Sequence, residues 1–168
     1  MERIVLVDEN DNVIGAKPRD ERTTDDIARV AALWLTNTKG GILLAQRSFT
    51  KNRNPGVWTA AAAGTVVDGE DYETNMIREV KEELGLDLKV SDLVFGPKHR
   101  VKAGVSNHFL QYYLCTHDVN PEDLVLQREE IEQVAWFTPR QLKEEIQTHP
   151  ENFSHSASQW GELLTTSK

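Results

Sequence analysis

Residues Gly64–Leu86 read GTVVDGEDYETNMIREVKEELGL, and this stretch decides the fold. From Asp71 to Leu84 it predicts a helix, because apolar residues recur there at helical spacing. These residues are Met76, Ile77, Val80 and Leu84. Gly85 follows directly and can end the helix in a left-handed cap. The stretch therefore predicts a glycine-containing loop, a helix with one buried face and an abrupt stop.

A second face of the same helix is acidic. Glu79, Glu82 and Glu83 are spaced i, i+3 and i+4, so their side chains share one surface. Two like charges about 5 Å apart repel by about 3 kcal/mol at an effective dielectric constant of 20, so something must offset them. Solvent, salt and the neighbouring Arg78 and Lys81 are one answer, since most acidic helix faces are simply solvated. A divalent cation is the other, because hard oxygen ligands suit Mg²⁺.

The spacing around the helix carries a family resemblance. Gly64 is followed by five residues, Glu70, seven residues and then REVKEELGL at Arg78–Leu86. This order resembles the box of the Nudix family without a mismatch, and it lies in the expected setting of strand, glycine loop, helix and glycine stop. The resemblance implies an α/β fold, a Nudix-type α/β/α sandwich with a mixed β-sheet whose box loop and helix carry the metal site.

The resemblance also implies residue roles within the box. Glu82 and Glu83 would ligate an essential Mg²⁺, for which Mn²⁺ could substitute. Glu79 would ligate metal and, as in some members, act as the catalytic base. Arg78 would hold Glu79 in place, and the carbonyl of Ala63 would add a ligand. Glu70 would be structural, and Gly64 and Gly85 would allow backbone shapes that a side chain hinders.

A later segment, Gln127–Gln141, extends the resemblance. Its acidic loop, tryptophan strand and proline-initiated helix are similar to a family segment whose loop often supplies one more metal carboxylate. Glu130 is the first choice for this ligand and for an alternative catalytic base, and Glu129 is the second. A solvated surface role is equally open, because loop carboxylates are usually exposed.

The N-terminal half resembles a particular branch of the family. Val7–Asp20 and Pro55–Thr59 are similar to stretches of isopentenyl-diphosphate isomerases and of the hydrolases most like them. The isomerase, which uses the same fold to move a double bond by protonation, is therefore the leading alternative function.

Three departures favour the hydrolase over the isomerase. Ala63 stands where isomerases have their catalytic cysteine, and Thr65 stands where they have a metal-binding histidine. Ser106 and His108 stand where they have two glutamates. A non-catalytic nucleotide-binding module is a third alternative, but such modules usually have a damaged box, and function is argued from the site rather than the fold.

The predicted reaction is cleavage of a pyrophosphate bond, in a nucleoside diphosphate linked to another moiety, by a metal-activated water. Glu79 or Glu130 would take the proton from that water. Basic and imidazole side chains are candidates for substrate binding, although solvated or core roles remain open for each. These candidates are Arg47, Arg53, His99, Arg100 and His108.

The chain as a whole sets further limits. Its 168 residues predict one domain over 1–168, with an N-terminal hairpin at about 3–17, the box at 64–86 and a C-terminal helix at about 154–164. The net charge of −8 argues against a general nucleic-acid partner. The single cysteine, Cys115, forms no intrachain disulfide and is expected in the core. No stretch approaches the roughly 20 apolar residues of a membrane span, so a cytoplasmic protein is predicted, and a homodimer is left open.

Hydrophobic patterns predict the remaining elements. A turn-forming cluster joins the two strands of the N-terminal hairpin, and a second hairpin is expected across the region 29–46. The predicted strands are Arg3–Val7, Asn12–Lys17, Arg29–Thr36, Ile42–Gln46, Val57–Ala63, Ser91–Lys98, Asn107–Thr116 and Gln133–Phe137. A further helix is predicted at Arg140–Ile146, where Pro139 in the first turn costs little.

Overall fold

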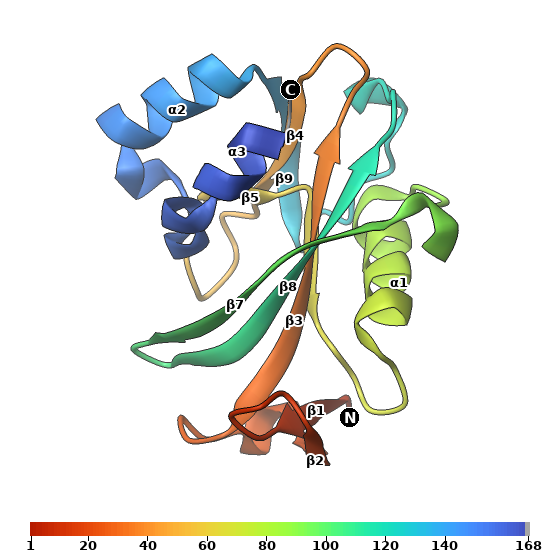
Figure 1. The fold of residues 1–168 in the computed structure, drawn as a ribbon, viewed down its shortest axis with the longest axis vertical. Coiled ribbons are helices and arrows are strands. Elements are labelled where there is room, and N and C mark those ends of the chain that lie inside the picture. Colours follow the sequence, from red (N-terminus) through yellow and green to blue (C-terminus); the bar gives the residue numbers. More distant parts are fainter. Residues whose placement is uncertain (167–168) are drawn as a thin grey trace.

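The computed structural model describes residues 1–166. Within these residues nine strands form one mixed sheet, with helices on both faces (Figure 1). The strands are β1 (Arg3–Val7), β2 (Val13–Pro18), β3 (Ile27–Thr36), β4 (Ile42–Arg47), β5 (Trp58–Ala60), β6 (Ala62–Thr65), β7 (Val94–Ala103), β8 (Ser106–Thr116) and β9 (Ile131–Phe137). The α-helices are α1 (Tyr72–Leu84), α2 (Pro139–Thr148) and α3 (Gly161–Thr166).

The long strand β3 is the centre of the sheet. It pairs antiparallel with β1, β4 and β6, and parallel with β8 over Ala28–Thr36. Its residues Leu33, Trp34 and Leu35 are buried. Consecutive apolar residues are what a strand covered on both faces requires, because successive side chains point to opposite faces. The N-terminal hairpin of β1 and β2 lies at one end of β3, away from α2 and α3 (Figure 1).

Two hydrophobic clusters cover the two faces of the sheet. On one face α1 buries Met76, Val80 and Leu84 among side chains of the central strands. On the other face Leu142 of α2 and Leu163 of α3 pack in the cluster that contains Trp34 and Ile42. The expected α/β/α sandwich with a mixed sheet is confirmed, and the acidic face of α1 is left at the edge of its layer.

Both ends of α1 are fixed by local chemistry. The Asp71 carboxylate accepts a hydrogen bond from the Thr74 backbone N–H at 2.8 Å, and the Thr74 hydroxyl accepts one from the Asp71 N–H at 3.0 Å. This reciprocal pair satisfies two N–H groups that a helix start leaves unpaired. Gly85 ends the helix with φ of 68°, and a Cβ there would lie 2.8 Å from Val125. The predicted glycine stop is confirmed.

Replacing Asp71 by alanine should lower the free energy of unfolding by about 1 kcal/mol, the usual cost of losing such a cap. Urea denaturation followed by circular dichroism measures this change. Glu73→Ala is the control, because Glu73 lies in the same first turn and accepts no capping bond. A loss for Asp71→Ala no larger than that of the control would contradict this account of the helix start.

Two strand predictions differ from the structure in their limits. The predicted strand Val57–Ala63 is divided at Ala61, because β5 pairs with β4 whereas β6 pairs with β3. The Ala61 N–H bonds the Leu33 carbonyl at 3.1 Å where the chain changes partner. The predicted strand Ser91–Lys98 begins later and runs longer, as β7, because its pairing with β8 continues to the hairpin turn. Both hairpins and the helix after Pro139 are confirmed.

The predicted C-terminal helix at 154–164 is wrong in part. The chain forms a 3-10 turn at His155–Gln159 and only then the short helix α3. Trp160 lies at the junction and is fully buried, with its indole N–H donating to the Tyr112 hydroxyl at 2.9 Å. Anchoring this large side chain fixes the segment, so its shape depends on the core and not on a helical period. Within residues 1–166 no helix has the length and apolar character needed to cross a membrane.

Candidate active site

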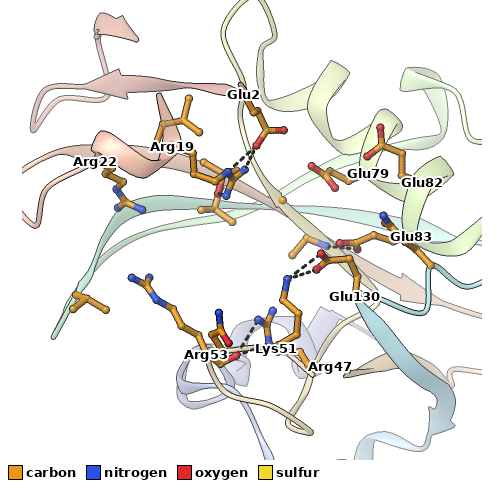
Figure 2. A pocket seen from close by; sticks show the side chains of 18 of the residues that line it. Glu2, Arg19, Arg22, Arg47, Lys51, Arg53, Glu79, Glu82, Glu83 and Glu130 are labelled. Carbon is orange, nitrogen blue, oxygen red and sulfur yellow. Dashed lines mark hydrogen bonds and ion pairs between the residues drawn. The ribbon is translucent and has the colours of Figure 1, made fainter. Parts of the chain in front are cut away.

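A cavity of about 840 Å³ lies between α1, the segment around β2 and the loop that follows β4 (Figure 2). Its lining carries opposite charges on different sides. The acidic lining residues are Glu2, Glu79, Glu82, Glu83 and Glu130. The basic lining residues are Arg19, Arg22, Arg47, Lys51, Arg53 and Arg78. This volume lies within the range of about 300–1,000 Å³ that is usual for small-molecule sites.

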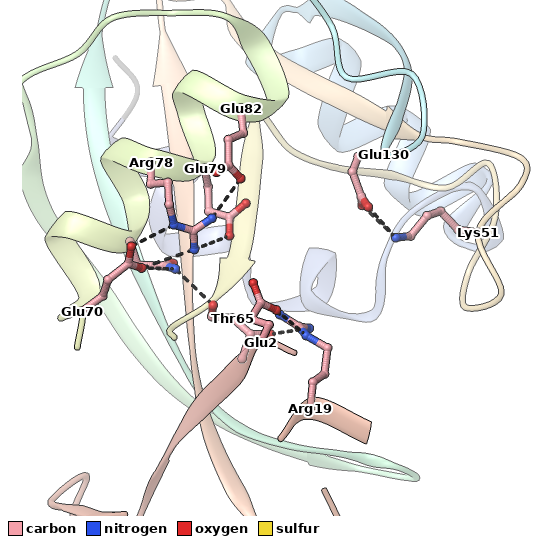
Figure 3. Close-up of polar contacts among 10 residues, drawn as sticks. Glu2, Arg19, Lys51, Thr65, Glu70, Arg78, Glu79, Glu82 and Glu130 are labelled. Atoms are coloured by element: carbon pink, nitrogen blue, oxygen red, sulfur yellow. Dashed lines mark hydrogen bonds and ion pairs between the residues drawn. The ribbon is translucent and has the colours of Figure 1, made fainter. Parts of the chain in front are cut away.

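Arg78 lies at the centre of three carboxylates (Figure 3). Its guanidinium nitrogens lie 2.8 Å from Glu70, 3.0 Å from Glu79 and 2.9 Å from Glu82. Glu70 also accepts a bond from the buried Asn75 amide at 3.1 Å. Arg78 therefore holds Glu79, as the resemblance implied, and Glu70 ties the box loop to the helix.

Glu83 is the most deeply placed acid of the cavity. It is 8% exposed, and its carboxylate accepts a bond from the Ala63 backbone N–H at 3.1 Å. Burial, together with the negative charge of Glu79, raises the pKa of Glu83 to about 8. Burial also raises the pKa of Glu79, and the nearby Glu82 adds to this. Such acids stay ionised at neutral pH when a cation binds them.

The donor set fits a hard divalent cation. Glu79, Glu82, Glu83 and Ala63 all line the cavity. Within residues 1–166 no three acidic, histidine or cysteine side chains lie close enough together to hold a metal ion between them. Mg²⁺ needs no closed cage, because it keeps several waters and binds through one or a few carboxylates. Buried, partly unpaired carboxylates beside open space are the arrangement that suits it.

Gly64 is required by space and not by its backbone angles. A Cβ built on Gly64 would overlap the carboxyl group of Glu79. Gly64 is absent from the residues with positive φ, whereas Gly85 is among them. The expectation of an unusual backbone shape is therefore correct for Gly85 and wrong for Gly64. Glycine at position 64 lets α1 approach β6 closely enough to place Glu79 in the cavity.

Glu130 reaches the cavity from the loop before β9. Its carboxylate accepts bonds from Lys51 Nζ at 2.9 and 2.8 Å, and its backbone carbonyl accepts one from the Ser48 N–H at 2.9 Å. Glu129, the second choice from the sequence, is not among the lining residues. The structure thus brings Glu130 to the acids of α1, with a lysine already bound to it.

Of the predicted substrate contacts, Arg47 and Arg53 line the cavity. Arg47 donates to the Arg53 backbone carbonyl at 3.2 and 3.0 Å, which shapes the loop between them. His99, Arg100 and His108 are not among the lining residues. Substrate binding by these three stays a prediction that their positions do not support.

The alternation of side chains along β7 and β8 explains these positions. Arg100 pairs with Glu9 at 3.0 Å and lies over the Phe109 ring. His99 lies beside Tyr112 at a ring distance of 6.1 Å, on the opposite face of the sheet. Burial, with the positive charges of Arg22 and Arg100, lowers the pKa of His108 to about 4. His108 is therefore neutral at physiological pH.

Sequence reasoning missed the N-terminal wall of the cavity. Glu2 and Arg19 form an ion pair at the rim, with Arg19 Nε 2.7 Å from the Glu2 carboxylate. Arg22 lines the same wall. The charged run KPRDERTTDD at 17–26 is the only signal, and such a run is typical of a solvated loop. Nothing in it indicates that the chain returns to the box.

Comparisons with known proteins identify the family of this chain. The family model described as NUDIX domain matches residues 26–157. An isopentenyl-diphosphate delta-isomerase of Corynebacterium diphtheriae is 30% identical over 161 residues, 92% of this chain and 88% of that protein. An uncharacterized Nudix hydrolase of Pseudomonas aeruginosa is 33% identical over 150 residues, 89% of this chain and 86% of that protein. A solved structure of a Deinococcus radiodurans protein superposes with a TM-score of 0.78 at 24% identity, covering 98% of each chain. The chain therefore belongs to the Nudix family, among members that resemble isopentenyl-diphosphate isomerases.

Proposed function

We propose that this chain, a Nudix hydrolase acting on diphosphate bonds, cleaves the pyrophosphate of a nucleoside diphosphate linked to another moiety and depends on Mg²⁺, with Mn²⁺ as a substitute. One observation carries the proposal. The intact acidic face of α1, including the buried Glu83, borders a cavity whose opposite side is cationic. That arrangement suits a bound cation at one side and substrate phosphates between the two.

The residues divide the work as follows. Mg²⁺ held by Glu79, Glu82, Glu83 and the carbonyl of Ala63 would lower the pKa of a water and neutralise diphosphate oxygens. Glu79 takes the proton of the attacking water, because its pKa is raised toward the working pH and Arg78 fixes its position at 3.0 Å.

Lys51 and Glu130 have linked roles in this scheme. Glu130 is the alternative base, but it must first release Lys51, which lies 2.8 Å away. Lys51 and Arg47 are the cations best placed to bind the phosphates near the acids, since both line the cavity beside Glu83 and Glu130. A lysine freed from Glu130 would bind the substrate while the carboxylate turns to metal or water.

A substrate screen tests the proposed function. Dinucleoside polyphosphates, nucleotide sugars, nucleoside diphosphates and nucleoside triphosphates are incubated with the protein and Mg²⁺, and released phosphate or monophosphate is measured. Turnover of at least one diphosphate class is expected. Absence of turnover across all classes with both Mg²⁺ and Mn²⁺ would reject the proposal and move the non-catalytic nucleotide-binding module to first place.

The isomerase is the second candidate, because the Corynebacterium relative carries that name over 92% of this chain. We expect no formation of dimethylallyl diphosphate from isopentenyl diphosphate with Mg²⁺. Ala63 has no thiol to exchange a proton with carbon, and the cavity residue Thr65 is a poor metal ligand. Product is measured by chromatography, with a known isomerase as the positive control. Formation well above the protein-free background would reverse the ranking of the two functions.

The remaining partner assignments follow from charge and composition. A small-molecule diphosphate is the proposed partner, and the net charge of −8 gives no support to nucleic-acid binding. A homodimer and a cytoplasmic location stay predictions from the sequence.

A further inference from the structure

Three arginines of the cavity, Arg22, Arg47 and Arg53, form no salt bridge among residues 1–166, and Arg47 donates only to the Arg53 backbone carbonyl. Within residues 1–166, the side chain of Arg53 forms no hydrogen bond or ion pair, and it is exposed to the cavity. Arg22 donates to the backbone carbonyl of Asn107 but forms no salt bridge among the described residues. By contrast, Lys51 is bound to Glu130 and Arg19 to Glu2. Arg47 lies near Glu83, whose pKa its positive charge lowers, so the positive charge on the side away from the acids of α1 is concentrated on Arg22 and Arg53.

Arg22 also has a hydrogen-bond donor without an acceptor. Its Nε is buried and has no hydrogen-bond partner within the described part of the chain. Asp26, the acid whose charge acts on Arg22, already accepts bonds from Lys17 Nζ at 2.6 Å and from the Thr23 N–H at 2.7 Å. A buried donor without a partner is rare in folded proteins and needs an explanation. One explanation is a ligand that accepts a hydrogen bond from Arg22 Nε in the working enzyme.

Arg22 and Arg53 interact electrostatically. Burial, followed by the positive charge of Arg53, lowers the pKa of Arg22, although the guanidinium remains protonated. Figure 2 shows their guanidinium ends close together, on the side of the cavity away from Glu79, Glu82 and Glu83. Two like charges held together without an acid favour a bound anion. Guanidinium groups match phosphate oxygens particularly well, because their planar fork donates two parallel hydrogen bonds.

We infer that Arg22 and Arg53 form an anion clamp for a substrate phosphate other than the diphosphate at Glu79, Glu82 and Glu83. The inference rests on the proposed function and narrows its substrate. A cavity of about 840 Å³ holds more than a diphosphate, and the clamp lies on its far side. The substrate is therefore a diphosphate that carries a further phosphate group. This phosphate can lengthen the phosphate chain of the substrate or be attached to its nucleoside. The two guanidinium groups would bind it through the same contacts in either case.

Binding tests the clamp without catalysis. Adenosine 3′,5′-bisphosphate and adenosine 5′-monophosphate are titrated into the protein by calorimetry in excess chelator. The bisphosphate should bind about tenfold more tightly or better, the scale of a charge-assisted hydrogen bond. Arg53→Ala and Arg22→Gln should each bring the ratio of the two dissociation constants closer to one. Arg140→Ala is the control, because Arg140 is an exposed arginine of α2 outside the cavity.

Kinetics separates the two sources of the phosphate. Coenzyme A is compared with dephospho-coenzyme A, and diadenosine tetraphosphate with diadenosine diphosphate. In at least one pair, kcat/KM should favour the member with the extra phosphate by about tenfold, and Arg53→Ala should remove most of that ratio. Arg53 is exposed and bonds nothing through its side chain, so this variant should fold even if Arg22→Gln does not.

The outcomes distinguish the clamp from the proposed function. Equal binding of the two nucleotides by wild type together with kcat/KM ratios near one in both substrate pairs, or an unchanged preference in Arg53→Ala, would overturn the clamp. An arginine-dependent preference without turnover of any diphosphate would support the clamp and reject the hydrolase. Turnover with ratios near one in both pairs would support the hydrolase and overturn the clamp.

Discussion

Glu79→Gln should lower kcat by about a hundredfold or more on the best substrate of the screen, the usual scale for a positioned acid–base group. Glutamine keeps the size of the side chain and its hydrogen-bonding reach but removes its charge and basicity. Glu79 points into the cavity and lies 3.0 Å from Arg78, so the substitution acts on the proposed site and not on the core. The apolar face of α1, with Met76, Val80 and Leu84 buried, is untouched.

The melting temperature of metal-free Glu79→Gln should be at or above that of wild type. Burial raises the pKa of Glu79, so its ionised form is unfavourable in the folded protein at neutral pH. A neutral amide removes that cost, although it also weakens the contact with Arg78. Glu73→Gln is the control, because Glu73 lies on the same helix outside the cavity lining. Equal activity of the two variants with saturating metal would mean that the box binds but does not catalyse.

The helix and its site could be predicted because their determinants are local. The apolar stripe, the acidic face and the glycine stop lie within Gly64–Leu86, and each follows from helical geometry alone. The contacts of Arg78 with Glu79 and Glu82 join residues one and four positions apart. Spacing of this kind is visible in a sequence, so α1 and its acidic face could be predicted without knowing the sheet.

Residue type makes Arg47, Arg53 and Glu130 candidates for the opposite wall, but its contacts could not be predicted, because they join distant segments. Arg22 reaches Asn107, 85 residues along the chain, and Lys51 reaches Glu130 across 79 residues. Charged residues in loops carry no period that indicates where they point. Residue type alone makes His99 and Arg100 candidates for substrate binding, but strand alternation and the register with β8 place them elsewhere. The register of strand pairing decides on which face of the sheet a side chain lies, and this register cannot be read from the sequence.

The local charge of the cavity differs from that of the whole chain. The chain has a net charge of −8, whereas the cavity lining has six basic and five acidic side chains. A substrate with several phosphates therefore meets a site that is close to neutral before any cation binds. A divalent cation would make the site positive, and this explains how an acidic protein can attract a polyanionic substrate.

Removing divalent cations with excess chelator should abolish turnover, and added Mg²⁺ should restore it. Without a metal, nothing in the described cavity lowers the pKa of the attacking water, and the ionised acids of α1 repel the substrate. Binding should also be visible without activity. At an Mg²⁺ concentration of about 100 times Kd the folded state gains about 2.7 kcal/mol, which for a chain of this size corresponds to a rise in melting temperature of about 5–10 °C.

Glu83→Gln separates metal binding from folding in this experiment. Because the pKa of Glu83 is about 8 in the metal-free protein, the side chain is largely neutral at pH 7, and the amide is a close substitute. The variant should therefore melt near the wild-type temperature in chelator, yet gain little from Mg²⁺. Glu73→Gln should respond to Mg²⁺ as wild type does, since Glu73 lies outside the cavity. Undiminished turnover in chelator, or an equal thermal response of Glu83→Gln and wild type, would contradict a metal site on the acidic face of α1.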